Sequence, residues 1–217
     1  MPRLKLRSRI RQLLIAMLFF AGASGGAVLS AELPKIHPAE SALEAFRQAG
    51  TPVSMSFVQT LSDSSGQILE RQEGRLEILP PNRFLWRYQS PYEAEFGSNG
   101  VLVWHWDQDL AQITVRDATK VVKGTPLALL LELKTELPIT VDDDGWLSWA
   151  PEDGDAQFAS LRLRMAENGP AELVLKDFLN QITELTFSNV QRPDSSVDPR
   201  FPAVGPEVLV VDERAEP

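Results

Sequence analysis

The stretch Gly74-Arg-Leu-Glu-Ile-Leu-Pro-Pro-Asn-Arg-Phe-Leu-Trp-Arg-Tyr88 decides which class of fold this chain can adopt. It places Phe84, Trp86 and Tyr88 at every second position, and alternate side chains of a β-strand point to the same face. The Pro80-Pro81-Asn82 triplet just before them favours a stiff turn. One face of this strand is therefore expected to bury three aromatic rings.

A second aromatic strand follows soon afterwards. Ser98-Asn99-Gly100 predicts a tight turn, because Asn-Gly readily adopts the positive φ angles that short hairpins need. The next strand, residues 101–107, carries Trp104 and Trp106. Two Trp-bearing strands so near in sequence are expected to lie close together in one antiparallel sheet.

Most of the remaining chain alternates apolar and polar residues between short turns, which is typical of an antiparallel meander. In residues 67–79 the positions expected to face inward are Gly74, Leu76 and Ile78. The whole pattern predicts a mainly β fold of about eleven strands. Further strands are expected at residues 51–60, 110–116, 146–149, 158–165, 171–176, 181–190 and 208–211.

Two segments predict helices instead. Residues 38–50 are rich in helix formers, place Leu43 and Phe46 on one face and stop at Gly50. Residues 124–133 begin with a possible Thr cap and a Pro and continue as a Leu-rich amphipathic helix. A helix this apolar has to be covered on nearly all sides or to face an apolar cavity.

The first 31 residues are typical of a secretory signal peptide. Five basic residues precede an apolar run at residues 13–21, and small residues lead to Leu29-Ser30-Ala31. An uncleaved N-terminal anchor is the alternative, although the apolar run is short for a membrane span. Residues 32–217 are expected to form one domain.

Charge and cysteine content exclude several classes of function. The chain has 21 basic and 30 acidic residues, and removing the signal would leave 16 basic against 30 acidic, a charge of −14. Nucleic acids and anionic membranes favour basic partners, so neither is expected as the main partner. The absence of cysteine excludes thiol chemistry, disulfides and the lipid attachment site of bacterial lipoproteins. A free protein of the periplasm or the exterior is expected.

The residues that usually carry catalysis are scarce. The only histidines are His37 and His105, and no nucleophile, phosphate-loop or zinc motif accompanies them. Asp142-Asp143-Asp144 lacks the alternate spacing of a calcium loop, which favours a solvated turn. We expect no catalytic residue, metal or cofactor. From composition alone, the aromatic residues fit a packed core as well as a ligand pocket.

The order of the motifs is more specific than any one of them. Over residues 38–212 the chain resembles the LolA family of periplasmic outer-membrane lipoprotein carriers. The motifs that carry this resemblance are Phe57-Val-Gln59, Gly74-x-Leu76, Pro81-Asn82-x-Phe84-x-Trp86, Asn99-Gly100-x-Leu102-x-Trp104-x-Trp106-Asp107, Asp109-Leu110-x-Gln112, Thr125-Pro126-Leu127 and Phe187-Ser-Asn189.

This resemblance implies an incomplete, open antiparallel β-barrel whose open side is covered by an α-helical lid. Its cavity would hold the acyl chains of lipoproteins received from the inner-membrane transporter LolCDE and passed to the outer-membrane acceptor LolB. A monomer without enzymatic activity is implied. The residues expected to line the cavity are Phe57, Leu76, Phe84, Trp86, Trp104, Leu127, Leu129 and Leu130.

One position departs from the family pattern. Family members commonly carry arginine directly before the Pro-Asn pair, where it is thought to hold the lid closed, whereas this chain has Pro80. Arg83 is the candidate replacement. Two alternative functions remain open: a periplasmic lipid-binding protein of the same fold with another cargo, and an esterase acting on lipids.

Overall fold

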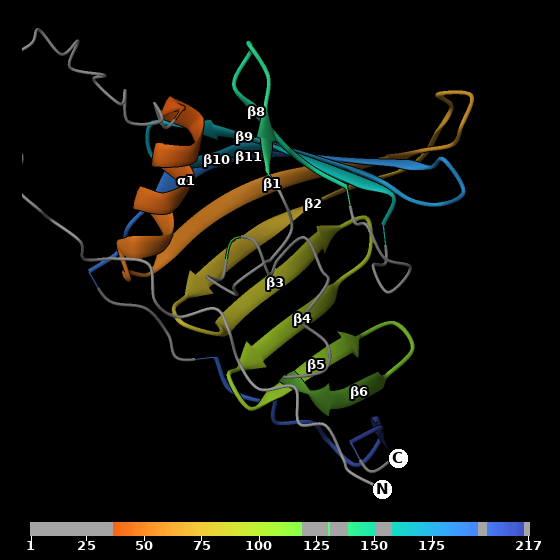
Figure 1. Cartoon of the computed structure of the whole chain (residues 1–217). Helices are drawn as coiled ribbons and strands as arrows, with labels where there is room; N and C mark the ends of the chain where they lie inside the picture. Colours follow the sequence, from red (N-terminus) through yellow and green to blue (C-terminus); the bar gives the residue numbers. More distant parts are fainter. Residues whose placement is uncertain (1–36, 119–129, 131–138, 151–157, 195–198, 215–217) are drawn as a thin grey trace, which may run out of the picture. The chain divides into compact units, whose positions relative to one another are not determined.

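Residues 37–118, 130, 139–150, 158–194 and 199–214 are described by this computed structural model. They include helix α1 (Pro38–Gln48) and a twelve-stranded sheet (Figure 1). The strands are β1 (Val53–Ser62), β2 (Ile68–Leu79), β3 (Arg83–Ser90), β4 (Ala94–Asn99), β5 (Leu102–Asp107), β6 (Gln112–Asp117), β7 (Thr140–Val141), β8 (Trp146–Trp149), β9 (Ser160–Ala166), β10 (Gly169–Lys176), β11 (Ile182–Gln191) and β12 (Leu209–Asp212).

The sheet is continuous but not closed. Its strand order is β12-β6-β5-β4-β3-β2-β1-β11-β10-β9-β8-β7, so in the described part of the chain the edge strands β12 and β7 do not pair with each other. Strand β1 joins the two arms, because it pairs with β2 on one side and with β11 on the other. The prediction of a mainly β fold with an open, largely antiparallel sheet is confirmed.

Helix α1 has the predicted single apolar face, on which Leu43 and Phe46 are buried. Its first turn is closed by a capping box: His37 Nδ1 accepts from Ala39 N at 3.2 Å, and Glu40 Oε2 accepts from His37 N at 3.2 Å. His37 therefore has a structural role at the start of this helix.

The long strands β1, β2 and β3 follow the predicted alternation. Leu76 and Ile78 are buried, and Gly74 lies beneath the ring of Phe57. This agrees with the prediction that these three residues face inward. A Cβ at Gly74 would lie 2.0 Å from the carbonyl oxygen of Arg87 and 2.7 Å from Phe57 Cζ. Glycine is therefore needed here for the close approach of strand and ring.

Three of the tight turns share one hydrogen-bonding pattern. In turns 63–67, 142–146 and 177–181 the first residue is an aspartate whose Oδ1 accepts backbone N–H groups two and four positions later. In turn 142–146, the Trp146 N–H and then Arg162 hold the pKa of Asp142 below its usual value. The interpretation of Asp142-Asp143-Asp144 as a turn is confirmed, and no acidic or histidine cluster suited to a metal occurs in the described ranges.

Strand β4 was not predicted from the sequence. It lies between the two Trp-bearing strands, which the sequence placed close together. Its segment Ala-Glu-Phe-Gly-Ser-Asn has a glycine in the middle and few residues that favour strands. The glycine has a packing role, because a Cβ at Gly97 would lie 2.1 Å from Cζ2 of Trp104.

The final strand also differs from a simple meander. Strand β12 pairs with β6 in parallel orientation, with Leu209 opposite Gln112. Before it, Phe201 and Val208 pack against a cluster formed by Leu85, Trp104 and Ile113. The C-terminal segment thus covers part of one face of the sheet.

We predict that Gly97→Ala lowers the free energy of unfolding by about 2 kcal/mol, since the added methyl group overlaps the Trp104 indole and neither strand can move away cheaply. Urea denaturation measures the change, with Ser64→Ala in an exposed turn as control. An unchanged midpoint for Gly97→Ala would contradict this packing.

Candidate functional site

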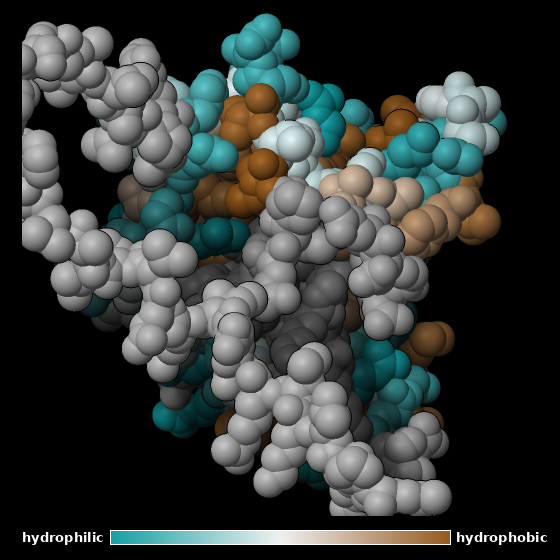
Figure 2. Space-filling view, in the orientation of Figure 1, coloured by the Kyte–Doolittle hydropathy of each residue, from teal (hydrophilic) through white to brown (hydrophobic). Residues whose placement is uncertain are grey.

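The inner face of the curved sheet carries the largest group of buried apolar side chains. Both arms contribute to it, and α1 packs against β8, β9 and β10. Figure 2 shows apolar surface beside α1 and β8 in this view. The buried members are Leu43, Phe46, Val53, Met55, Phe57, Leu76, Ile78, Phe84, Val103, Ala118, Leu130, Leu147, Trp149, Phe158, Leu161, Leu163, Leu173, Leu185 and Phe187.

Three aromatic rings meet on this inner face. The Phe57 ring centroid lies 5.2 Å from that of Trp86 and 5.3 Å from that of Tyr88, with a nearly perpendicular plane in the second case. These are the separations and tilts at which aromatic pairs attract each other. Trp86 and Tyr88, which are two positions apart in the sequence, therefore form one aromatic surface together with Phe57.

Polar groups at the margin of this surface are joined in a chain. The Tyr88 hydroxyl donates to Gln59 Oε1 at 3.1 Å, and Gln59 Nε2 donates to Gln72 Oε1 at 3.1 Å. Burial raises the pKa of Tyr88 to about 12, so the phenol is neutral at physiological pH. These three side chains contribute no charge of their own, although the nearby Glu70 carboxylate also raises the pKa of Tyr88.

The structure brings most of the predicted lining residues together. Phe57, Leu76 and Phe84 are buried in the inner cluster, and Trp86 packs against it while partly exposed. Leu130 is helical, 3% exposed and a member of the same cluster. Leu127 and Leu129, with the rest of the predicted lid helix, lie outside the described residues.

Trp104 does not lie on the inner face, so the prediction that it lines the same surface as Phe84 is wrong. Its neighbour Val103 belongs to the inner cluster, so strand alternation turns Trp104 to the outer face. There its Nε1 donates to Glu95 Oε1 at 2.9 Å, and Arg87 Nε donates to Glu95 Oε2 at 2.8 Å. Tryptophan content alone did not reveal which face each ring takes.

His105 stacks on Phe96, with ring centroids 4.1 Å apart and planes 10° apart. Burial lowers the pKa of His105 from its usual value, Asp107 opposes this shift, and Arg116 adds to it. The pocket beside it, of about 480 Å³, is lined by Gln72, Tyr88, Tyr92, Glu93, Ala94, Phe96, His105, Asp107, Asp109 and Leu110. Among the described residues, that lining contains no serine, threonine or cysteine that His105 could activate.

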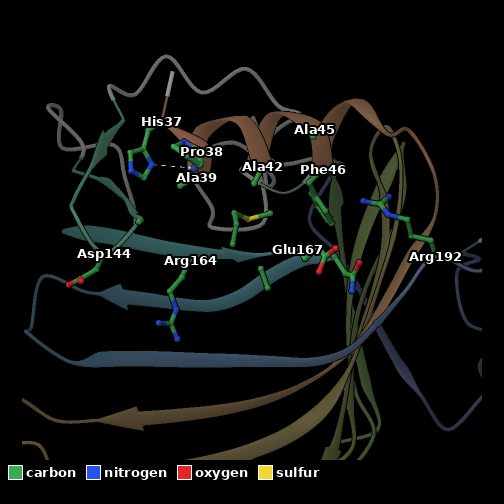
Figure 3. Close-up of a pocket in the computed structure, with 15 residues that line it drawn as sticks. His37, Pro38, Ala39, Ala42, Ala45, Phe46, Asp144, Arg164, Glu167 and Arg192 are labelled. Carbon is green, nitrogen blue, oxygen red and sulfur yellow. Dashed lines mark hydrogen bonds between the residues drawn. The ribbon is translucent and has the colours of Figure 1, made fainter. Parts of the chain in front are cut away.

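A second pocket, of about 470 Å³, lies between α1 and the β9–β10 hairpin (Figure 3). Phe46 points from the helix into it, and the Arg192 guanidinium stands 5.4 Å from the Phe46 ring centroid. Its rim mixes both signs of charge, with Arg164 and Glu167 among the lining residues. Arg192 directly follows β11, so this contact links the helix to the end of that strand, and the pocket shares Phe46 with the inner cluster.

At the corner before β3, Arg83 donates from Nη2 to the carbonyl oxygen of Pro80 at 3.3 Å. Arg83 directly precedes Phe84, which faces inward. Because successive strand residues point to opposite faces, the Cβ of Arg83 points to the outer face. Its replacement of the family arginine as a lid contact stays a prediction.

Residues 50–202 match the model of a family described as "Outer membrane lipoprotein carrier protein LolA". This match covers well over half of the chain. The chain belongs to the LolA family. Among curated relatives, the outer-membrane lipoprotein carrier protein of Alkalilimnicola ehrlichii is 35% identical over 162 residues, 72% of this chain and 75% of that protein. The protein of the same name from Halorhodospira halophila is 34% identical over 178 residues, 79% of this chain and 84% of that protein.

Among solved structures, an uncharacterised conserved protein from Thermus thermophilus is similar to this LolA-family chain with a TM-score of 0.52 at 14% identity. The similarity covers 82% of this chain and 100% of that one. It supports the fold alone. Within the described ranges, no helix has the length and hydropathy needed to cross a membrane.

We predict that His105 makes stability fall in mild acid. Because its folded pKa lies below the unfolded value, the unfolded chain binds the proton more readily, so the stability from neutral His105 is lost as pH falls below the unfolded pKa. Wild type should lose more stability than His105→Gln between about pH 7.5 and about pH 5.5, as measured by urea denaturation. Equal losses in the two proteins would contradict this.

Proposed function

We propose that this protein carries lipoproteins across the periplasm by holding their acyl chains on the inner face of its open sheet. The carrier names of its relatives and the family match support this role. The observation that carries the proposal is the aromatic surface of Phe57, Trp86 and Tyr88 on the inner side of an unclosed sheet. An acyl chain gains about 0.8 kcal/mol for each buried CH₂, so such a surface holds a chain without any directional contact.

In this proposal the cargo is an acylated lipoprotein released from the inner membrane by LolCDE and delivered to LolB at the outer membrane. The expected signal peptide and the absence of cysteine fit a protein that is free in the periplasm. The predicted lid helix would cover the acyl chains in transit. Release requires that this cover be only marginally stable.

The esterase alternative has less support. The described residues that line the pocket beside His105 include no serine, threonine or cysteine, so a general base there has no nucleophile among them. A lipid-binding protein with another cargo would use the same inner face. The two binding functions differ in what they bind, and this difference can be measured.

We predict that Trp86→Ala weakens binding of a synthetic acylated lipopeptide about tenfold, equivalent to losing burial of roughly two methylene groups. Trp106→Ala is the matched control, because Trp106 is also partly buried but packs in the outer cluster with Trp104. Fluorescence titration in a buffer where both variants remain folded measures the affinities. Equal losses of affinity in the two variants would show that the inner face does not bind the cargo.

A competition experiment distinguishes the carrier from a general lipid-binding protein. A carrier of lipoproteins should take up the lipopeptide from detergent micelles in preference to a free fatty acid or a phospholipid of equal chain length. Equal uptake of all three would favour the lipid-binding alternative. Absence of uptake, with the protein folded, would contradict both.

A further inference from the structure

Two turns that are separate in the sequence become neighbours at one end of the inner face. The β3–β4 turn, residues 91–93, and the β5–β6 turn, residues 108–111, lie side by side because Ala94 is paired with Asp107. Figure 1 shows both turns at the right-hand ends of their strands. Both contribute lining residues to the pocket of about 480 Å³ beside His105.

The strand register places this pocket on the same face as the aromatic surface. Phe96 lies opposite Trp86 on one side and opposite His105 on the other, and directly paired residues share a face. The Tyr88 ring borders both regions, since its centroid lies 5.3 Å from that of Phe57 and 6.4 Å from that of Phe96. A group bound in the pocket therefore lies next to an acyl chain held on the aromatic surface.

Aromatic rings form much of the pocket wall, and solvent can reach them. Tyr92 is 63% exposed and Phe96 is 38% exposed. Stacking on His105 holds the Phe96 ring in place. The faces of aromatic rings carry partial negative charge and attract cations, most of all those with an apolar stem that packs on the ring.

The charge of the lining has one sign. Glu93, Asp107 and Asp109 line the pocket, and none of its described lining residues is lysine or arginine. Asp107 Oδ1 accepts from Leu110 N at 2.9 Å, a contact that engages only one of the two carboxylate oxygens. Burial lowers the pKa of His105, so its ring adds no positive charge at neutral pH. Charge complementarity therefore favours a cation as the occupant.

The arginine whose charge acts on His105 is paired elsewhere. Arg116 donates from Nε to Glu213 Oε2 at 2.5 Å, so it has its own carboxylate partner. Within the described ranges, no acidic and histidine side chains are grouped closely enough to hold a metal ion. Aromatic walls combined with carboxylates instead suit an organic cation, either an alkylammonium or a guanidinium group.

We propose that this pocket binds the cationic side chain of a lysine or arginine. In the proposed function that residue belongs to the lipoprotein, and to this extent the inference rests on the proposed function. The 6.4 Å between the Tyr88 and Phe96 centroids corresponds to about two residues of extended chain, so the basic residue stands close to the acylated one. An ethanolamine headgroup carries the same ammonium, but its phosphate would be repelled by the carboxylates.

Fluorescence titration with synthetic lipopeptides tests the inference. A lipopeptide with lysine directly after the acylated residue should bind about fivefold more tightly than one with uncharged norleucine there. Moving the lysine about ten residues along the peptide should remove most of this preference, because that distance is on the order of 30 Å in an extended chain. General attraction to an acidic protein would not depend on the position of the lysine.

A pair of charge-matched variants locates the effect. Glu93→Gln/Asp109→Asn should abolish the preference for lysine over norleucine. Asp143→Asn/Glu184→Gln should keep it, because this control removes the same charge from exposed positions outside the pocket lining. All four positions are exposed, so urea midpoints should stay unchanged. Equal affinity of wild type for the two peptides, or a preference that survives Glu93→Gln/Asp109→Asn, would overturn the inference.

Probes without an acyl chain separate this inference from the proposed function. Hexylammonium should shift the NMR signals of the His105 ring more than hexanol does, with the His37 ring as internal reference. If no lipopeptide binds, the proposed function fails, and the cation site is supported by a hexylammonium shift that Glu93→Gln/Asp109→Asn removes. Absence of that shift in wild type would overturn the site. A carboxylate-dependent preference for phosphatidylethanolamine over phosphatidylcholine, without one for lysine, would also overturn it.

Discussion

The pairing of β1 with both β2 and β11 is the constraint on which the rest of this structure depends. Phe57 lies opposite Gly74 on one side and opposite Phe187 on the other. This joins the arm formed by β2–β6 to the arm formed by β7–β11, so that buried side chains of both arms belong to one apolar cluster. Without the long-range β1–β11 pairing, each arm would be a separate sheet with an exposed apolar face and an open edge.

Apolar side chains are divided between two faces with different tasks. On the inner face, Phe57, Trp86 and Tyr88 form the aromatic surface. On the outer face, Trp104 is covered by Phe201 and bonded to Glu95, which Arg87 also holds. The outer cluster is closed by the chain's own C-terminal segment, whereas the inner face belongs to the candidate site.

A carrier has to bind an apolar cargo and later release it, and the physical character of the inner face fits this requirement. The contacts available there are non-directional, and the polar chain of Tyr88, Gln59 and Gln72 at its margin is neutral. A charged group would fix one orientation or cost desolvation when an acyl chain arrives. Membership of the LolA family and this surface lead to the same proposed role by independent routes.

The sequence by itself determined the long strands, their turns and the face that most side chains take, because a period of two is a local property of the backbone. It also indicated the Asp142 turn, the apolar face of α1 and the family. Only the tertiary structure decided that β4 separates the two aromatic strands, that Trp104 faces outward above Gly97, that β12 pairs in parallel, and that two distant turns become neighbours. These depend on which strand pairs with which and on how closely their side chains approach, and no local pattern encodes either.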